Sequence, residues 1–300
     1  MINPKKKLIT CPLCSNKNFK VIIEPRLNNL NPQELYGAAS GIKGSQRLVK
    51  CTQCSLIYEN PRFDEKHILS GYQMSNESDH DSQYSNRVKS FLDTLIKNEN
   101  CLPKRGAKIL DVGTAGGAFL EAAEKFGYNA SGLEPNNYLV QKGKLKGLRI
   151  FKGTIKENNL GDLKFDLITY WDVIEHLTNP MQEIKNAKEY LKENGLILIN
   201  YPDIGTIQAK LAGEKYWWIL SVHLVHFTKK TIKLLLEKNN MELVSIKRYW
   251  QTLDFGYLIL TAAKLKFPFA NLIYNFLPSY IKRLKIPYFA SQFTVISRFK

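Results

Sequence analysis

The fold of this chain is decided by residues 109–136, which read ILDVGTAGGAFLEAAEKFGYNASGLEPN. An apolar run ends in a glycine turn, an amphipathic segment follows, and a second apolar run ends on Glu134. A glycine turn between a strand and a helix lets a ligand approach the backbone N–H groups, because glycine has no Cβ. A carboxylate about 20 residues further on, at the end of the next strand, can accept both hydroxyls of a ribose. The stretch therefore predicts a site for a nucleotide-like cofactor.

From residue 107 onward, short apolar runs alternate with segments of helical periodicity. The expected strands are residues 107–113, 129–135, 148–153, 164–171 and 195–202. The expected helices are residues 116–127, 136–147 and 180–195. Such an alternation forms a parallel sheet whose right-handed crossovers place helices on both faces. After a further helix over 228–240, the runs 241–250 and 292–299 can pair antiparallel. The chain is therefore predicted to be an α/β protein with a doubly wound sheet.

Four of the five cysteines form two CxxC pairs, CPLC at 11–14 and CTQC at 51–54. Two residues between thiolates let both sulfurs face one metal ion, so Cys11, Cys14, Cys51 and Cys54 predict a closed, structural zinc site. The alternatives are two disulfides or unrelated buried thiols, and a reducing cytoplasm argues against disulfides. The polar segment 28–46 between the pairs is expected to be an exposed loop. Cys101 stands alone and is expected to be an inert packed thiol.

These patterns divide the chain into three parts. Residues 1–62 are expected to form a small zinc-ribbon module, and residues 63–104 a polar connector that becomes a lid helix. Residues 105–300 are expected to form the main domain, with a basic, aromatic insertion around 256–290.

The spacing of the glycines separates two cofactors. A nicotinamide dinucleotide favours G-x-G-x-x-G, with its pyrophosphate at the helix end, and residues 113–117, GTAGG, do not have that spacing. S-adenosylmethionine has no phosphate and needs an acid at the strand end, close glycines and a ribose acid. In the remaining alternative the glycines serve packing only.

Residues 111–136 resemble the first motif of the class I S-adenosylmethionine-dependent methyltransferases, D/E-x-G-x-G-x-G followed by a ribose acid. Residues 151–180 and 223–249 resemble later motifs of the ubiquinone/menaquinone-type branch of that family. The cysteine spacing resembles that of certain sugar-modifying methyltransferases. The resemblance implies a seven-stranded, Rossmann-like sheet with an antiparallel final strand.

The same resemblance implies a set of cofactor contacts. In the first motif, Ala115 replaces the middle glycine. A lid residue, Arg87, is expected to pair with the methionine carboxylate. The implied contacts are Arg87, Asp111, Gly113, Ala115, Gly117, Glu134, Thr154, Ile155, Trp171 and Asp172.

Methyl transfer can require a base, and histidine is the natural one near neutral pH. His176, His223 and His226 are expected near the carboxyl edge of the sheet, as candidate catalytic residues. The alternatives are a structural hydrogen bond for His176, and packing or a metal pair at helical spacing for His223 and His226. Glu175 is expected to be solvated or to cap a helix.

The chain carries 43 Lys and Arg residues against 27 Asp and Glu residues, a formal net charge of +16. Such an excess attracts nucleic acid, anionic membranes or acidic substrates without selecting among them. Residues 255–300 contain no Asp or Glu. The insertion around 256–290 can lie on an anionic membrane, cover a substrate, bind RNA, or form a packed helical hairpin with a solvated basic face.

The N-terminal residues have no apolar core of the kind that a signal peptide needs, and no apolar run is long enough to span a bilayer. We therefore expect a cytoplasmic protein, peripheral to the inner face of the membrane if the basic insertion binds lipid.

The predicted function is methyl transfer to O or C of a small molecule, a sugar or a lipid-linked glycan. The alternative is a zinc-ribbon nucleic-acid-binding protein whose methyltransferase-like domain modifies RNA or senses the cofactor. Residues 170–173, YWDV, stand in place of an N/D-P-P-Y/F tetrapeptide, which argues against amino methylation of bases. The glycine spacing disfavours a nicotinamide oxidoreductase.

Overall fold

The computed structural model describes residues 5–26, 32–37, 44–75, 83–157, 160–264 and 268–300. In this part of the chain the strands are β1 (Phe19–Ile23), β2 (Leu48–Cys51), β3 (Ile57–Glu59), β4 (Lys108–Val112), β5 (Asn129–Glu134), β6 (Ile150–Lys152), β7 (Phe165–Trp171), β8 (Leu191–Pro202), β9 (Val225–His226), β10 (Met241–Arg248), β11 (Gln251–Asp254), β12 (Lys285–Tyr288) and β13 (Gln292–Phe299). The α-helices are α1 (Pro32–Tyr36), α2 (Glu65–Gln73), α3 (Tyr84–Lys97), α4 (Ala118–Phe126), α5 (Asn137–Leu145), α6 (Pro180–Lys188), α7 (Ile207–Ala212), α8 (Lys229–Lys238), α9 (Phe255–Lys264), α10 (Ala270–Phe276) and α11 (Ser279–Lys282). The short 3-10 helices are η2 (Glu99–Cys101), η3 (Ile155–Glu157), η4 (Ile174–His176) and η5 (Gly213–Lys215).

The central feature is a seven-stranded sheet with the strand order β10-β13-β8-β7-β4-β5-β6. The strands from β8 to β6 run parallel, and β13 and β10 complete the sheet by antiparallel pairing. The parallel strands are apolar runs because both faces of the sheet are covered, so Ile109 and Leu110 point to opposite faces and are both buried. The predicted α/β doubly wound sheet with an antiparallel final pair is confirmed.

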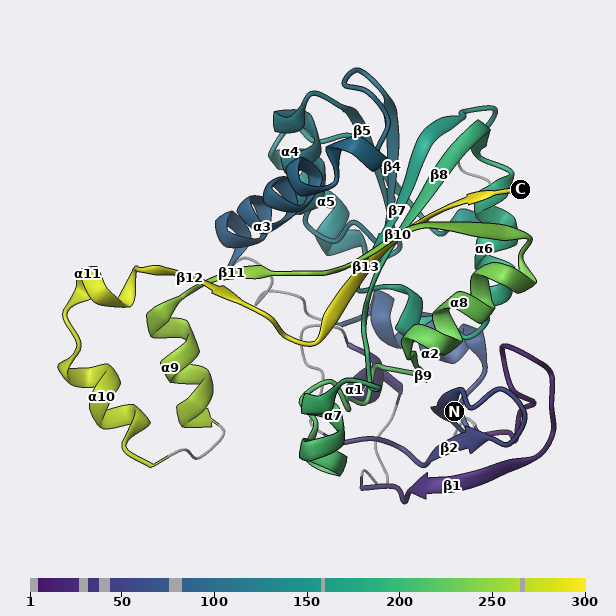
Figure 1. Ribbon diagram of the computed structural model, residues 1–300, viewed down its shortest axis with the longest axis horizontal. Coiled ribbons are helices and arrows are strands. Elements are labelled where there is room, and N and C mark those ends of the chain that lie inside the picture. Colours follow the sequence, from purple (N-terminus) through teal and green to yellow (C-terminus); the bar gives the residue numbers. More distant parts are fainter. Residues whose placement is uncertain (1–4, 27–31, 38–43, 76–82, 158–159, 265–267) are drawn as a thin grey trace.

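Helices cover both faces of this sheet (Figure 1). On one face, Phe91 of α3 and Phe119 of α4 belong to a hydrophobic core with Leu167 of β7. On the other face, α6 and α8 contribute Ile184 and Leu235 to a larger core. Among the described residues, no helix is long and apolar enough to cross a lipid bilayer.

A second sheet, with the order β1-β2-β3-β9, contains the N-terminal strands. Its last strand comes from far along the chain, because Ile57 and Tyr58 of β3 pair with His226 and Val225 of β9. The buried residues of the N-terminal part, such as Leu56, share one core with Ile168 of the main sheet. The N-terminal part is therefore packed onto the main sheet, and its own sheet takes its fourth strand from residues 225–226.

Two of the expected chain segments differ in the structure. The helix expected over 180–195 ends at Lys188, because Leu191 already pairs with Phe165 as the first residue of β8. The segment 28–46 was expected to be an exposed loop, but it contains α1, whose Leu35 and Tyr36 are buried. Residues 28–31 and 38–43 of that segment lie outside the described residues.

An arm, residues 251–288, is inserted between β10 and β13. Its two strands, β11 and β12, pair antiparallel from Gln251 with Tyr288 to Asp254 with Lys285. Beyond this ribbon, α9, α10 and α11 project away from the body of the molecule (Figure 1).

Candidate active site and cysteine cluster

The turn after β4 has a backbone that requires glycine at two positions. Gly113 and Gly117 have φ angles of 70° and 84°, in the left-handed region. A Cβ at Gly113 would lie 2.6 Å from Cγ2 of Val173, and one at Gly117 would lie 2.3 Å from Cδ1 of Leu148. Ala115 also has a left-handed φ, of 50°, at the position where the class I motif has its middle glycine.

Asp111 lies buried in β4 just before this turn. Its carboxyl accepts a hydrogen bond of 2.7 Å from the hydroxyl of Thr169 on the neighbouring strand β7. Burial raises the pKa of Asp111 to about 7, against the opposing effects of Thr169 and the Arg87 guanidinium. A cationic group brought against this carboxyl would favour its ionised form.

Glu134 ends β5 and is completely buried. One oxygen of its carboxylate accepts the backbone N–H of Ala115 at 2.9 Å, and the other accepts the N–H of Asn136 at 2.7 Å. The predicted ribose acid therefore lies against the glycine turn, and it holds the turn through a backbone amide.

Thr154 and Ile155 follow β6, beside the end of β5. The backbone N–H of Gly153 donates to the carbonyl of Glu134 at 3.0 Å, which joins the two strand ends. Ile155 is buried, and the N–H of Thr154 donates to the carboxylate of Glu157 at 2.9 Å. These two implied cofactor contacts are thus neighbours of the predicted ribose acid.

A cavity lies at the turn and is lined in part by the helix α3. Tyr84, Arg87 and Phe91 of α3 line it together with Asp111, residues 113–116 and Trp171. A buried carboxyl and a guanidinium thus line one space, which suits a ligand that carries both an ammonium and a carboxylate group.

Trp171, at the end of β7, is one of the residues that line this cavity. Its ring centroid lies 4.7 Å from that of Phe91, 5.2 Å from that of Phe119 and 5.5 Å from that of Tyr249. The indole N–H of Trp171 is buried and has no hydrogen-bond partner in the described part of the chain. Sequence reasoning missed Phe91, although it shares the apolar face of its helix with Val88.

Asp172 follows Trp171 with a left-handed φ of 55°. The side-chain amide of Gln292, at the start of β13, donates to its carboxylate. Burial raises the pKa of Asp172 to about 6, while Arg87 and Gln292 favour its charged form. Gln292 was also missed, because nothing in its local sequence marks a polar residue of a buried strand as functional.

The three candidate histidines gather in one cluster. The rings of His176 and His223 meet edge to face, with centroids 4.8 Å apart, and the His226 ring lies 6.0 Å from that of His223. Nδ1 of His176 lies 3.0 Å from the carbonyl oxygen of Val222, and Nδ1 of His223 lies 2.8 Å from that of Trp218. A carbonyl only accepts hydrogen bonds, so in each neutral ring the proton is on Nδ1 and Nε2 keeps its lone pair.

Burial sets the charge state of two of these rings. Burial, with His176 and His226 nearby, holds the pKa of His223 well below its usual range. Burial lowers the pKa of His226 to about 4, and Nε2 of that ring is buried without a hydrogen-bond partner in the described residues. His176 is the least buried of the three.

One expectation at this cluster, for Glu175, is wrong, and the alternative of a helical spacing for His223 and His226 is wrong as well. Glu175 is 1% exposed, and its carboxyl oxygens have no hydrogen-bond partner among the described residues, so it is neither solvated nor a cap. Burial, with Asp172 nearby, raises the pKa of Glu175 well above its usual range. His223 and His226 are not on a helix, since His226 belongs to β9. The ligand atoms that approach one another within 4.8 Å, a grouping able to hold a metal ion, come from Glu175, His176 and His223.

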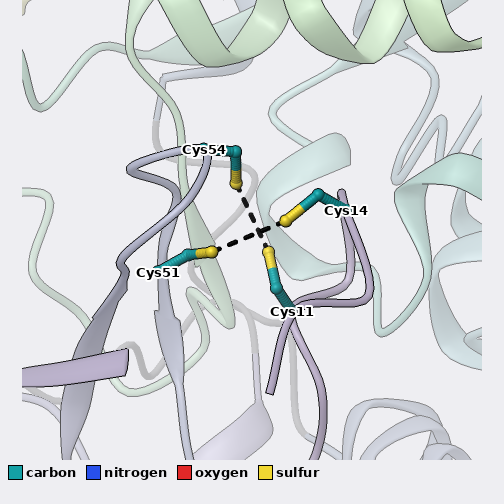
Figure 2. A group of neighbouring side chains, drawn as sticks. All are labelled: Cys11, Cys14, Cys51 and Cys54. Atoms are coloured by element: carbon teal, nitrogen blue, oxygen red, sulfur yellow. Dashed lines mark hydrogen bonds between the residues drawn. The ribbon is translucent and has the colours of Figure 1, made fainter. Parts of the chain in front are cut away.

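The four cysteines of the CxxC pairs converge on one point (Figure 2). The Sγ atoms of Cys11 and Cys54 are 3.5 Å apart, as are those of Cys14 and Cys51. A tetrahedral zinc ion with Zn–S bonds of about 2.3 Å has S–S edges of about 3.8 Å, so the four sulfurs fit such an ion.

The two CxxC turns are equivalent in geometry. In each, the residue after the second cysteine has a left-handed φ, of 60° at Ser15 and 66° at Ser55. The N–H groups of Ser15 and Ser55 donate to the carbonyls of Cys11 and Cys51, at 2.8 Å and 3.1 Å. Although burial opposes it, the backbone N–H groups of residues 53 and 54 lower the pKa of Cys51 to about 6.

Comparisons with known proteins agree with this architecture. Residues 80–246, more than half of the chain, match a protein family described as "Methyltransferase domain". The chain is similar to ubiquinone biosynthesis O-methyltransferase of Actinobacillus pleuropneumoniae, with 32% identity over 106 residues, 32% of this chain and 45% of that protein. It is 26% identical over 185 residues to the mitochondrial protein of that name from Dictyostelium discoideum, covering 54% of this chain and 58% of that protein. The chain spans about half the length of the curated relatives it matches.

Among solved structures, PH0226 protein from Pyrococcus horikoshii has a similar fold. Its TM-score is 0.50 at 15% sequence identity, over 74% of this chain and 94% of that chain. The sheet and the glycine turn define a Rossmann-like protein of the class I methyltransferase type. The chain belongs to the methyltransferase-domain family, and the resemblance to S-adenosylmethionine-dependent methyltransferases is confirmed.

Proposed function

We propose that this protein transfers a methyl group from S-adenosylmethionine to O or C of a small molecule, a sugar or a lipid-linked glycan. The observation that carries the proposal is the cavity over the glycine turn, which is lined by both Asp111 and Arg87. The amino-acid end of S-adenosylmethionine is a zwitterion, and a carboxylate and a guanidinium would hold its two charges. The indole N–H of Trp171, which has no hydrogen-bond partner among the described residues, supports a polar ligand in this cavity.

The other end of the cofactor would lie along the ends of β5 and β6. Glu134 would accept the ribose hydroxyls, in exchange for one of its two backbone N–H partners. Thr154 and Ile155 would lie against adenine, and the turn from Gly113 through Ala115 to Gly117 would pass beneath the ligand. Asp172 would border the methionine portion. When bound, S-adenosylmethionine supplies a methyl group already activated on a sulfonium.

We assign the proton-accepting role to His176. Its Nδ1 is oriented by the carbonyl of Val222, so Nε2 is the basic nitrogen and can take a proton from an acceptor hydroxyl or carbon. His223 and His226 are more deeply buried, and we assign them to the support of the His176 ring. The ring of His223 packs edge to face on that of His176.

The cysteine cluster is proposed to hold one Zn²⁺ ion with a structural role. Four thiolates close a tetrahedral shell and leave no position for water or substrate. The two equivalent turns and the approach of all four sulfurs support this assignment.

The acceptor class rests on the relatives, which are named as ubiquinone biosynthesis O-methyltransferases. A small molecule or quinone-like acceptor fits that similarity, and a sugar or lipid-linked glycan extends it.

We place the protein in the cytoplasm, in part at the inner face of the membrane. The net charge of +16 also supports the second candidate, an RNA-modifying methyltransferase.

Calorimetry with S-adenosylmethionine and with NAD tests the cofactor assignment. We expect binding of the first at micromolar concentration and no binding of the second; binding of NAD alone would refute the proposal. Labelled S-adenosylmethionine, offered with lipid extracts, sugar nucleotides and RNA, would then identify the acceptor. Label in RNA alone would favour the second candidate.

A further inference from the structure

The arm exposes apolar side chains that the rest of the described chain does not cover. Of the described residues in 255–288, only Gly256 and Ala270 are buried. The apolar residues of α9 are half-exposed, although this helix reads FGYLILTAAK. This segment is rich in aliphatic and aromatic residues and buries few of them. Such an exposed apolar surface is typical of a binding site for a protein or a membrane.

Four strongly exposed apolar side chains lie along α10 and its N-cap. Phe269, Leu272, Ile273 and Phe276 are 74%, 55%, 50% and 80% exposed. Their spacing of three and four residues aligns them along one side of the helix, with Ala270 turned inward. We call these four residues the outer stripe. Tyr280, 72% exposed, continues the apolar surface into α11.

The charge around the outer stripe has one sign. Residues 255–288 contain five Lys and Arg residues and no Asp or Glu. Arg283 is exposed on the turn after α11, and the ammonium group of Lys282 lies 4.3 Å from the centre of the Tyr274 ring. Cations that flank an exposed aromatic surface without any acid complement a surface that is both apolar and negatively charged.

We propose that the arm binds the protein to an anionic lipid bilayer. The outer stripe enters the boundary between headgroups and acyl chains, and Lys282 and Arg283 contact the phosphate layer. The helices of the arm project from the body of the protein at the end of the β11–β12 ribbon (Figure 1). The arm can therefore contact the membrane while the body of the protein stays away from it. This inference deepens the proposed membrane location, and it holds whether the methyl acceptor is a lipid or a soluble sugar.

Flotation of the full chain with vesicles tests this inference. The vesicles are phosphatidylcholine alone, or phosphatidylcholine with about 30% phosphatidylglycerol, in about 0.05 M and about 0.5 M NaCl. We expect flotation with the anionic vesicles at low salt and much less with the neutral ones. The double variant Phe269→Ser/Phe276→Ser should weaken flotation by at least about tenfold.

The matched control is Leu145→Ser/Leu211→Ser, because these leucines of α5 and α7 are 85% and 84% exposed but lie outside the arm. It should float like the wild type. Thermal unfolding followed by circular dichroism shows whether each variant is folded. Calorimetry with S-adenosylmethionine shows whether a variant that loses membrane binding still binds the cofactor. Absence of flotation by the wild type, or equal loss in both double variants, would overturn the inference. Self-association in sedimentation experiments that depends on Phe269 and Phe276, without flotation, would assign the outer stripe to a second copy of the chain instead.

Discussion

The carboxylate of Glu134 accepts the backbone N–H of Ala115 at 2.9 Å, so the acid at the end of β5 is bound to the turn after β4. The same residue is the proposed ribose acceptor. Ligand recognition and the shape of the turn therefore depend on one side chain.

Replacement of Glu134 by Ala should weaken S-adenosylmethionine binding by roughly 10- to 100-fold, since charge-assisted hydrogen bonds contribute about 1.5–3 kcal/mol each. Glu134→Gln keeps one acceptor oxygen, so its affinity for S-adenosylmethionine should lie between those of the wild type and Glu134→Ala. Calorimetry measures the change, with Glu121→Ala as the control, because Glu121 is a partly exposed acid on α4 that pairs with Lys125. Unchanged affinity in Glu134→Ala would remove the ribose role.

Gly117→Ala should lower the free energy of unfolding by about 2–4 kcal/mol. The new Cβ would need a left-handed φ of 84° and would lie 2.3 Å from Leu148 Cδ1. Gly116→Ala is the control, because no atom lies within 4 Å of its Cβ position, and it should change stability by less than about 0.5 kcal/mol. Urea unfolding compares the two. Equal stabilities would mean that neither the left-handed φ nor the contact with Leu148 costs free energy.

His176→Asn should lower kcat by roughly 100-fold or more if the acceptor has to lose a proton. The apparent KM for S-adenosylmethionine should stay nearly constant, because the ring is assigned to the acceptor. The pH profile of kcat separates a base from a positioning residue, since loss of the base removes the acid limb. If His226→Asn gives the larger fall and loses that limb, the base is His226.

Glu59→Gln should change how stability depends on pH. Glu59 is buried, accepts the Tyr36 hydroxyl at 3.2 Å, and burial raises its pKa to about 7 from a usual 4.5. The folded protein then keeps a proton that the unfolded chain loses above pH 4.5, so stability falls as pH rises from about 4.5 to 7.

Over that window the wild type should lose about 3 kcal/mol relative to Glu59→Gln. Urea unfolding of both proteins across the window measures this difference. A difference that does not vary with pH would show that Glu59 is already ionised at pH 4.5 in the folded protein.

We expect the wild type to bind about one zinc ion per chain. Cys14→Ser should abolish this binding and lower the Tm by on the order of 10 °C. Metal analysis and thermal unfolding provide the two readouts. Cys101→Ser, outside the cluster, should retain the metal. Wild-type protein that binds no zinc when refolded with it would contradict the assignment.

The parts of the molecule that sequence predicts well are those with local causes. The strand 108–112 is an apolar run that ends in glycine, and Asp111 and Glu134 mark the two strand ends beside the turn. These residues lie close together in the chain, so their spacing predicts their geometry. The cysteine pairs can be predicted for the same reason, because each CxxC turn is a local structure. The preference of thiolates for a shared metal ion then predicts that the two turns lie together.

The parts that sequence predicts poorly depend on distant contacts. Gln292 reaches Asp172 across 120 residues of sequence, and Glu175 is buried because His223 and β9 pack over it. The helix that begins at Pro180 ends at Lys188 because its next residues pair with β7, a tertiary effect that outweighs its helical pattern. No local pattern contains these partners.

The pairing of β3 with β9 has a consequence for synthesis on the ribosome. The N-terminal sheet is translated early, yet its fourth strand is residues 225–226. Until residues 225–226 leave the ribosome, the edge of β3 that pairs with β9 stays unpaired. The N-terminal sheet therefore cannot be completed before that point. The segment that is translated first is thus among the last to be completed.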